Sequence, residues 1–200
     1  QPAYQFIKAL LSNVNDIQVD SEHLMVISPD EGGTSRAVYL ANVLGVDMGM
    51  FYKRRDYTKV INGRNPIVAH EFLGSNVEGK DVLVIDDMIS SGESMIDVAR
   101  KLKALHAKRI FLYSTFGLFT NGMEKFDEAY KEGLFYRVLT TNLVYRTPEL
   151  LSREYYISCD MSKYIALLID TLNHDASVSD LLDPYERIHR FLDRYKNGQV

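Results

Sequence analysis

The run of four aliphatic residues from Val82 to Ile85 constrains the fold more than any other feature of the sequence. Strands that are apolar at every position are typical of parallel sheets whose two faces are both covered. Other short β-rich runs alternate along the chain with segments of helical periodicity, and this alternation is typical of βαβ units. The sequence therefore predicts an α/β fold with a mainly parallel sheet flanked by helices.

Seven segments have the composition of strands, and several stretches between them have helical periodicity. The candidate strands are 24–28, 46–52, 67–73, 81–86, 110–116, 135–141 and 155–159. The candidate helices are 3–11, 35–44, 94–106, 123–132 and 161–172, with a final helix after Pro184. In helix 94–106 an apolar stripe is expected to face the core, made of Met95, Val98, Leu102 and Leu105.

The composition excludes several classes of function. The chain has 200 residues, 46% of them hydrophobic, which is enough for one well-buried core or two small ones. A net charge of −4 argues against a protein that binds nucleic acid. No apolar stretch approaches the roughly 20 residues needed to span a bilayer. The single cysteine, Cys159, sits in an apolar run and is interpreted as a buried structural thiol, so we expect a soluble cytoplasmic protein.

Two acids and a small-residue loop follow the aliphatic run. Asp86 and Asp87 come directly after it, and the loop Ser90 to Ser94 opens onto the helix that follows. Backbone N–H groups and the helix dipole converge at such a point and favour a phosphate group. In doubly wound sheets this point lies at the carboxyl edge of the strands, where ligands bind. The alternative is an ordinary strand-to-helix turn with capping serines and solvated acids.

This segment resembles the phosphoribosyl pyrophosphate motif of type I phosphoribosyltransferases and of ribose-phosphate pyrophosphokinases. The resemblance implies a type I phosphoribosyltransferase-like fold, in which Asp86 and Asp87 hold the ribose hydroxyls. It also implies that the loop holds the 5-phosphate through Ser90, Ser91, Gly92, Glu93 and Ser94. The pyrophosphokinases usually carry an acid at the position of Ser90 and a glycine at that of Glu93. A carboxylate there weakens phosphate binding unless it points outward into solvent.

A second segment, VISPDEGGTSR, favours the pyrophosphokinases over the phosphoribosyltransferases. A strand again ends near an acid, Asp30, and Gly32 and Gly33 give the backbone freedom to turn amides toward a ligand. The segment is similar to a pyrophosphokinase stretch that Asp30, Gly32, Gly33 and Arg36 match. The resemblance implies that Asp30 binds Mg²⁺ and that the glycines line the pyrophosphate. An ordinary capping turn is the alternative.

A third segment concentrates positive charge between two candidate strands. Its cations are Lys53, Arg54, Arg55, Lys59 and Arg64, and we expect a mobile basic loop. Cations on such a loop can stabilise the charge of a transferring diphosphoryl group. The segment resembles a pyrophosphokinase strand ending in which a lysine and an arginine are catalytic, which implies these roles for Lys53 and Arg55. A merely solvated basic face is the alternative.

Mg²⁺ is the cofactor that the resemblance implies, because it accompanies phosphoryl transfer from ATP. Asp30 would be a ligand, together with a histidine that the family supplies from its other domain. The five histidines of this chain are scattered and show no metal-ligand spacing, so a bound transition metal is not expected.

The start of the chain favours an interpretation as part of a larger protein. Gln1 is followed directly by an amphipathic helix, and the first strand comes only after it. We expect residues 1–182 to form the phosphoribosyltransferase-like C-terminal domain of a synthetase whose N-terminal domain is absent. Residues 183–200 are expected to form a helical tail that docks on its own domain, on the missing half or on a neighbouring subunit.

The resemblance implies a ribose-phosphate diphosphokinase, which transfers the diphosphoryl group of ATP to ribose 5-phosphate. It also implies a homo-oligomer, based on dimers or extending to a hexamer, whose ATP sites use both domains and a neighbouring chain. Two alternatives stay open. A type I phosphoribosyltransferase would use the same acids and loop, and a catalytically silent regulatory relative would bind without turnover.

Overall fold

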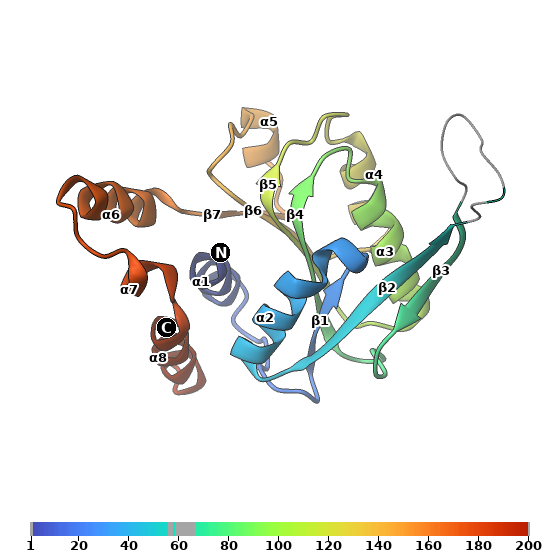
Figure 1. Cartoon of the computed structure of the whole chain (residues 1–200). Helices are drawn as coiled ribbons and strands as arrows, with labels where there is room; N and C mark the ends of the chain where they lie inside the picture. Colours follow the sequence, from blue (N-terminus) through green and yellow to red (C-terminus); the bar gives the residue numbers. More distant parts are fainter. Residues whose placement is uncertain (1, 56–57, 59–66, 200) are drawn as a thin grey trace.

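The structure, a computed structural model, describes residues 2–55, 58 and 67–199. Within them a seven-stranded sheet runs through the molecule, with helices on both faces (Figure 1). The strands are β1 (Leu24–Ser28), β2 (Asp47–Arg55), β3 (Ile67–Leu73), β4 (Asp81–Ile89), β5 (Ile110–Gly117), β6 (Arg137–Thr141) and β7 (Tyr156–Cys159). All seven predicted strands are confirmed.

The longer helices are α1 (Ala3–Asn13), α2 (Thr34–Leu44), α3 (Glu93–Ala104), α4 (Glu124–Lys131), α6 (Ser162–Asn173) and α8 (Tyr185–Lys196). Three short turns of helix accompany them, η1 (Glu31–Gly33), α5 (Pro148–Leu151) and α7 (Ser179–Leu182). The short turns were not predicted, because four residues or fewer carry no readable periodicity. In the described part of the chain, no helix is long and apolar enough to cross a membrane.

The order of the strands across the sheet locates the ligand edge. The order is β3-β2-β1-β4-β5-β6-β7, and only the β2–β3 pair is antiparallel. After β1 the chain proceeds outward to β2, whereas after β4 it proceeds in the opposite direction to β5. The topological switch point therefore lies between β1 and β4, where α/β sheets open a crevice at the carboxyl ends of the strands.

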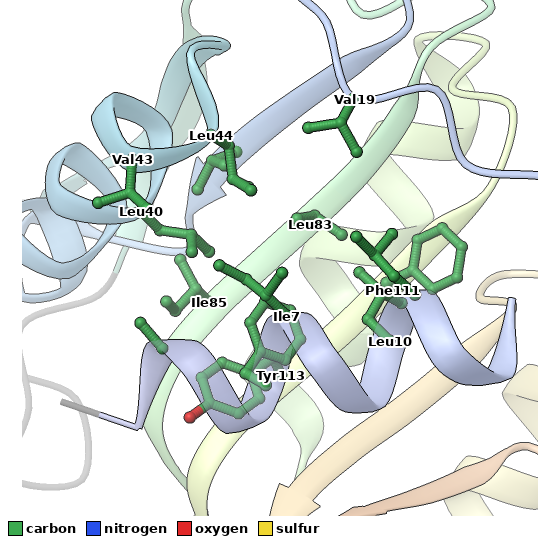
Figure 2. Packing of buried hydrophobic residues seen from close by; sticks show 14 of the residues in the cluster. Ile7, Leu10, Val19, Leu40, Val43, Leu44, Leu83, Ile85, Phe111 and Tyr113 are labelled. Atoms are coloured by element: carbon green, nitrogen blue, oxygen red, sulfur yellow. The ribbon is translucent and has the colours of Figure 1, made fainter. Parts of the chain in front are cut away.

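Alternate residues of the central strands pack into two separate hydrophobic cores, one on each face of the sheet. One layer contains α1, α2 and α8 over the face that carries Leu83 and Ile85, and the other contains α3 and α4 over the face that carries Val82 and Val84. Figure 2 shows Ile7 and Leu10 of α1 lying over the first of these faces. Each fully buried side chain of this size contributes about 1.5–3 kcal/mol. The doubly covered sheet that the aliphatic run predicts is confirmed.

The last helix packs into the same core as the rest of the chain. Ile188, Phe191 and Leu192 of α8 are buried among residues of α1 and α2. The hydroxyl of Tyr195 accepts a hydrogen bond from the Ile17 amide at 3.2 Å. Tyr185, the first residue of α8, is half exposed.

Two other expectations require correction. Leu105 was placed on the apolar stripe of the 94–106 helix, but α3 ends at Ala104 and Leu105 is 40% exposed. The chain turns sharply there, because His106 adopts a left-handed conformation with φ of 62°. The strand predicted to end at Asp86 continues to Ile89, because its pairing with β5 continues through Met88 and Ile89.

Cys159 is fully buried at the end of β7, as predicted. Burial raises the pKa of its thiol to about 12. A thiol with so high a pKa forms almost no thiolate near neutral pH, which supports the structural interpretation of this residue.

Candidate functional site

The two acidic motifs lie side by side at the switch point. Ile27 of β1 pairs with Val84 of β4, so Asp30 and Asp86 follow adjacent strands at the same edge of the sheet. Gly33 packs closely against the end of β1, because a Cβ on this residue would lie 2.5 Å from Ser28 Oγ, and it would also contact the Ile85 carbonyl oxygen of β4 at 3.4 Å. A side chain at position 33 would therefore require Ser28 to move.

Asp30 caps the short helix η1 with its own side chain. Its Oδ1 accepts hydrogen bonds from the amides of Gly32 at 3.0 Å and Gly33 at 3.3 Å. The glycine amides that the sequence assigns to a pyrophosphate are thus directed at a carboxylate in this structure. A bound anion could use these amides only after Asp30 had turned away.

Arg36 connects the first motif to the second. It projects from α2, and its Nη2 donates to Asp86 Oδ1 at 3.2 Å and lies 3.6 Å from Asp87 Oδ1. Its buried Nε has no hydrogen-bond partner within the described part of the chain. The guanidinium therefore retains donor capacity inside the site. The structure thus brings Arg36 together with Asp86 and Asp87.

Asp86 is the carboxylate that the fold disfavours most in this site. Burial raises the pKa of Asp86 to about 6, opposed by the Asp87 amide, which donates to it at 2.8 Å. The carboxyl group of Asp87 and the charge of Asp30 raise this pKa further. Charges of one sign are therefore crowded together, and a bound cation or a set of ligand hydroxyls would relieve their repulsion.

The loop Ser90 to Ser94 joins β4 to α3 and presents a helix N-terminus. Gly92 has φ of +82°, and a Cβ there would lie 2.2 Å from the Phe126 ring, so both the conformation and the space require glycine. The amides from Ser91 to Ser94 donate no hydrogen bond to any described group, and no side chain caps the helix. Amides without a partner at the N-terminus of a helix favour a bound phosphate.

Glu93 stands at the first turn of α3, and a neighbouring cation balances the charge of its carboxylate. It forms an ion pair with Lys125 of α4, and its side chain is 61% exposed. The hydrogen bond from Lys125 lowers the pKa of Glu93. The outward orientation that the sequence left open is the one observed, and Lys125 balances the charge of this carboxylate.

Two residues near this loop were missed by the sequence interpretation, namely Lys125 and Thr120. The Thr120 amide donates to the Ser90 carbonyl oxygen at 3.0 Å, and its hydroxyl lies 3.5 Å from Ser90 Oγ. Both follow β5, which neighbours β4 in the sheet. The rule that carboxyl ends of adjacent parallel strands share one edge could have indicated them.

Lys53 and Arg55 belong to strand β2 and not to a loop, which corrects the prediction for these two residues. The antiparallel hairpin with β3 continues past the body of the sheet, pairing Lys53 with His70 and Arg55 with Ile67 (Figure 1). Met50 pairs with Ser28 at the end of β1, so the later residues of β2 extend beyond the edge where Asp30 lies. The side chains of both residues, and the predicted cations Lys59 and Arg64, lie outside the described part of the structure.

The acids of the site do not form a complete metal cage. Among the described residues, no three histidine, cysteine, aspartate or glutamate side chains gather closely enough to hold a metal ion. Mg²⁺ usually binds through one or two carboxylates plus substrate phosphates and waters. The carboxylates of Asp30 and Asp86 are oxygen donors that fit that mode of binding, and the charge of Asp30 contributes to the raised pKa of Asp86.

Comparisons with known proteins agree with this geometry. The family model described as "Phosphoribosyl transferase domain" matches residues 1–143. A ribose-phosphate pyrophosphokinase of Vibrio parahaemolyticus is 29% identical over 160 residues, covering 80% of this chain and 48% of the relative. One from Thermococcus kodakarensis is 31% identical and covers 75% of this chain and 55% of the relative. The chain spans about half the length of these curated relatives.

A solved structure shows the same fold. The phosphoribosylpyrophosphate synthetase from Mycobacterium smegmatis superposes with a TM-score of 0.67 at 19% identity, covering 86% of this chain and 51% of that one. The predicted type I phosphoribosyltransferase-like sheet is thereby confirmed. With a family model that covers most of its length, a sheet of the same fold and both acidic motifs at the switch point, this chain belongs to the phosphoribosyl transferase domain family.

Proposed function

We propose that this chain carries the sugar-phosphate and diphosphate half of a ribose-phosphate diphosphokinase. The observation that carries the proposal is the meeting of Asp86, Asp87 and the free amides of α3 at the switch point, with Arg36 and Asp30 beside them. The names of the relatives support the same activity. The substrates would be ATP and ribose 5-phosphate, and the products phosphoribosyl pyrophosphate and AMP.

The site divides naturally between the two ends of the sugar. The uncapped N-terminus of α3, with the hydroxyls of Ser90, Ser91 and Ser94, would hold the 5-phosphate through amides that have no other partner. Asp86 and Asp87 would accept hydrogen bonds from the ribose hydroxyls. Since burial already disfavours the charge on Asp86, hydroxyl donors there replace water that the fold has removed.

The reaction would place the 1-hydroxyl of the ribose in line with the β-phosphorus of ATP. A bond forms between that oxygen and the β-phosphorus, the bond to the α-phosphate oxygen breaks, AMP leaves, and the hydroxyl loses its proton. Catalysis of this kind consists of positioning and charge stabilisation. Lys53 and Arg55 would stabilise the transferring group from the end of β2, and Asp30 would hold Mg²⁺, which neutralises phosphate charge when bound.

The remaining features of the proposal concern the whole protein. A chain that spans about half of its relatives would supply part of an ATP site, with the remainder coming from a second domain and a neighbouring subunit of a homo-oligomer. A cytoplasmic location is proposed as well, since the single cysteine is buried and reduced.

The test begins with the binding of ribose 5-phosphate to the 200-residue chain, measured by calorimetry. We expect Asp86→Asn to weaken binding by about tenfold or more, because a hydrogen bond to a charged group contributes roughly 1.5–3 kcal/mol. The matched control, Asp170→Asn on the exposed face of α6, should leave binding unchanged. Equal binding by wild type and Asp86→Asn would refute the assignment of the sugar site.

Turnover is tested on the intact protein that contains this chain. AMP release from ATP with Mg²⁺ and ribose 5-phosphate should be lost with Lys53→Ala while sugar-phosphate binding persists. Binding without any AMP release by the unmodified protein would favour the silent regulatory relative. Transfer of a phosphoribosyl group to a nucleobase would favour the interpretation as a phosphoribosyltransferase instead.

A further inference from the structure

A hollow between helices lies far from the switch point. It encloses about 490 Å³ between α1, the end of β7, α6 and α8. β7 is the edge strand of the sheet, and the two strands β5 and β6 separate it from β4. The hollow therefore shares no strand with the candidate site, and the proposed function assigns it no role.

The hollow exists because α6 leaves the body of the molecule. Figure 1 shows α6 projecting from the end of β7, away from the sheet. None of its twelve residues is buried against the described part of the chain. Leu167 and Tyr164 line the inner wall from α6, and Tyr4 faces them from α1. The apolar and aromatic surfaces of these side chains remain available to a ligand.

Three cations line this hollow, each from a different helix. Lys8 comes from α1, Lys163 from α6 and Arg187 from α8, and none of them forms an ion pair with a described residue. Arg187 lies 5.2 Å from the centroid of the Tyr4 ring, so its guanidinium is held at the wall by a cation–π contact. In a chain of net charge −4, three cations around one space that contains a single carboxylate indicate an anionic ligand.

The one acid of the hollow offsets only part of this charge. Asp160 accepts hydrogen bonds from the Asn142 side chain at 2.9 Å and from the Ser162 amide at 2.9 Å. The hydrogen bond from the Ser162 amide, with a smaller effect of Arg146, lowers the pKa of Asp160, so this carboxyl group stays ionised. The hollow is thus lined by three cations and one carboxylate, and an excess of positive charge remains for a ligand.

Positive charge continues from the hollow along α8. A smaller hollow of about 290 Å³ shares Tyr4 and Arg187 with the first and adds Arg190 and Arg194. Residues 187, 190 and 194 are spaced by three and four, so they lie on one face of the helix. The cations thus extend beyond the reach of a single monoanion and suit a group with two or more negative charges.

We propose that this hollow is a second ligand site, which binds a small organic phosphate with an aromatic body. The phosphate would lie among Lys8, Lys163 and Arg187, and the aromatic part would lie against Tyr4, Tyr164 and Leu167. Its volume falls in the range of roughly 300–1,000 Å³ that small-molecule sites occupy. The proposal does not depend on the diphosphokinase activity, because no residue is shared with that site.

Phenyl phosphate is the probe, titrated without Mg²⁺ into the ¹⁵N-labelled chain. We expect the amide signals of Ala9, Lys163 and Leu167 to shift, and those of Ser91 to Ser94 to shift less. Phenol and inorganic phosphate, the two halves of the probe, should each bind more weakly than the whole. Binding of phenol or of phosphate as tight as that of phenyl phosphate would overturn the proposed combination.

A pair of double variants tests the cations. Lys163→Gln with Arg187→Gln should weaken binding by about fivefold to tenfold, since each of the two partly exposed ion pairs contributes at most about fivefold. The matched control, Arg100→Gln with Lys131→Gln on α3 and α4, removes the same charge elsewhere and should change binding less than twofold. Equal weakening in both would mean nonspecific attraction and overturn the site. The site would also be overturned if the chain dimerised with rising concentration and only Lys163→Gln with Arg187→Gln abolished the dimer. A protein surface would then cover the hollow.

Discussion

At the amino end of β4, Asp81 is almost fully buried and receives two hydrogen bonds from Arg109, at 2.9 Å and 2.5 Å. Arg109 also donates to Asp16 at 2.7 Å. At the carboxyl end of the same strand, five residues further on, Asp86 is only partly compensated by Arg36 and stands beside two other acids.

The two ends of β4 show how one strand can serve stability and function separately. The hydrogen bonds that Arg109 donates to Asp81 and Asp16 raise the pKa of Arg109, so the native state favours the charges at this end. Burial without sufficient donors raises the pKa of Asp86, so the native state disfavours the charge at the other. A group that the fold leaves unsatisfied is available to a ligand.

The largest predicted effect, on the free energy of unfolding, comes from removing the ion pair between Arg109 and Asp81. Arg109→Met leaves Asp81 buried without its partner, and this should cost about 3–5 kcal/mol of the free energy of unfolding. Urea denaturation measures the loss. The matched control is Arg100→Met, since Arg100 is 58% exposed and lies 3.9 Å from Glu132. If both variants lose equally little, the buried pair does not stabilise the amino end as argued.

A smaller effect of opposite sign is expected at the unsatisfied end. Asp86→Asn removes a charge that the fold disfavours, so it should raise the free energy of unfolding by about 1–3 kcal/mol near neutral pH. The same variant binds ribose 5-phosphate more weakly, as predicted above. A loss of stability on this substitution would mean that Arg36 compensates Asp86 fully, and the contrast between the two ends would fail.

The pH dependence of this gain follows from the direction of the pKa shift. The pKa of Asp86 is raised from 3.8 to about 6, so the folded chain retains this proton over a range in which the unfolded chain has lost it. The carboxyl group therefore costs stability progressively as pH rises through that window, and the full cost is present above about pH 6. The advantage of Asp86→Asn should be largest above this window and vanish below about pH 4.

The sequence predicted the position of both acidic motifs, because an aliphatic run followed by acids has one common place in a doubly wound sheet. It did not predict the network of Asp16, Asp81 and Arg109, whose members lie far apart in the chain and follow no periodic pattern. The end predicted for β4 was also too early in the chain. Strand pairing between Met88 and Phe116 is a long-range property, and the local switch from apolar to acidic residues hides it.

Long-range contacts explain the misjudged basic segment as well. The cations from Lys53 to Arg55 are polar and suggest a loop when considered alone, but pairing with β3 continues the strand through them. In the same way, the departure at Glu93 looked like a defect of the phosphate loop until Lys125, thirty-two residues later, was found beside it. Patterns within a segment predict its type, whereas partners across segments determine its charge.

The smallest predicted effect tests the ion pair between Glu93 and Lys125. Because Lys125 already compensates the Glu93 carboxylate, Glu93→Gln should change the affinity for ribose 5-phosphate by less than about twofold, as expected for a screened surface pair. Lys125→Gln leaves the carboxylate uncompensated at the start of α3, so it should weaken binding more, and the double variant should restore it. Calorimetry on the three variants measures this cycle. If Glu93→Gln alone strengthened binding severalfold, the carboxylate would act on the phosphate directly, and the carboxyl end of β4 would contain one more unsatisfied charge than the structure indicates.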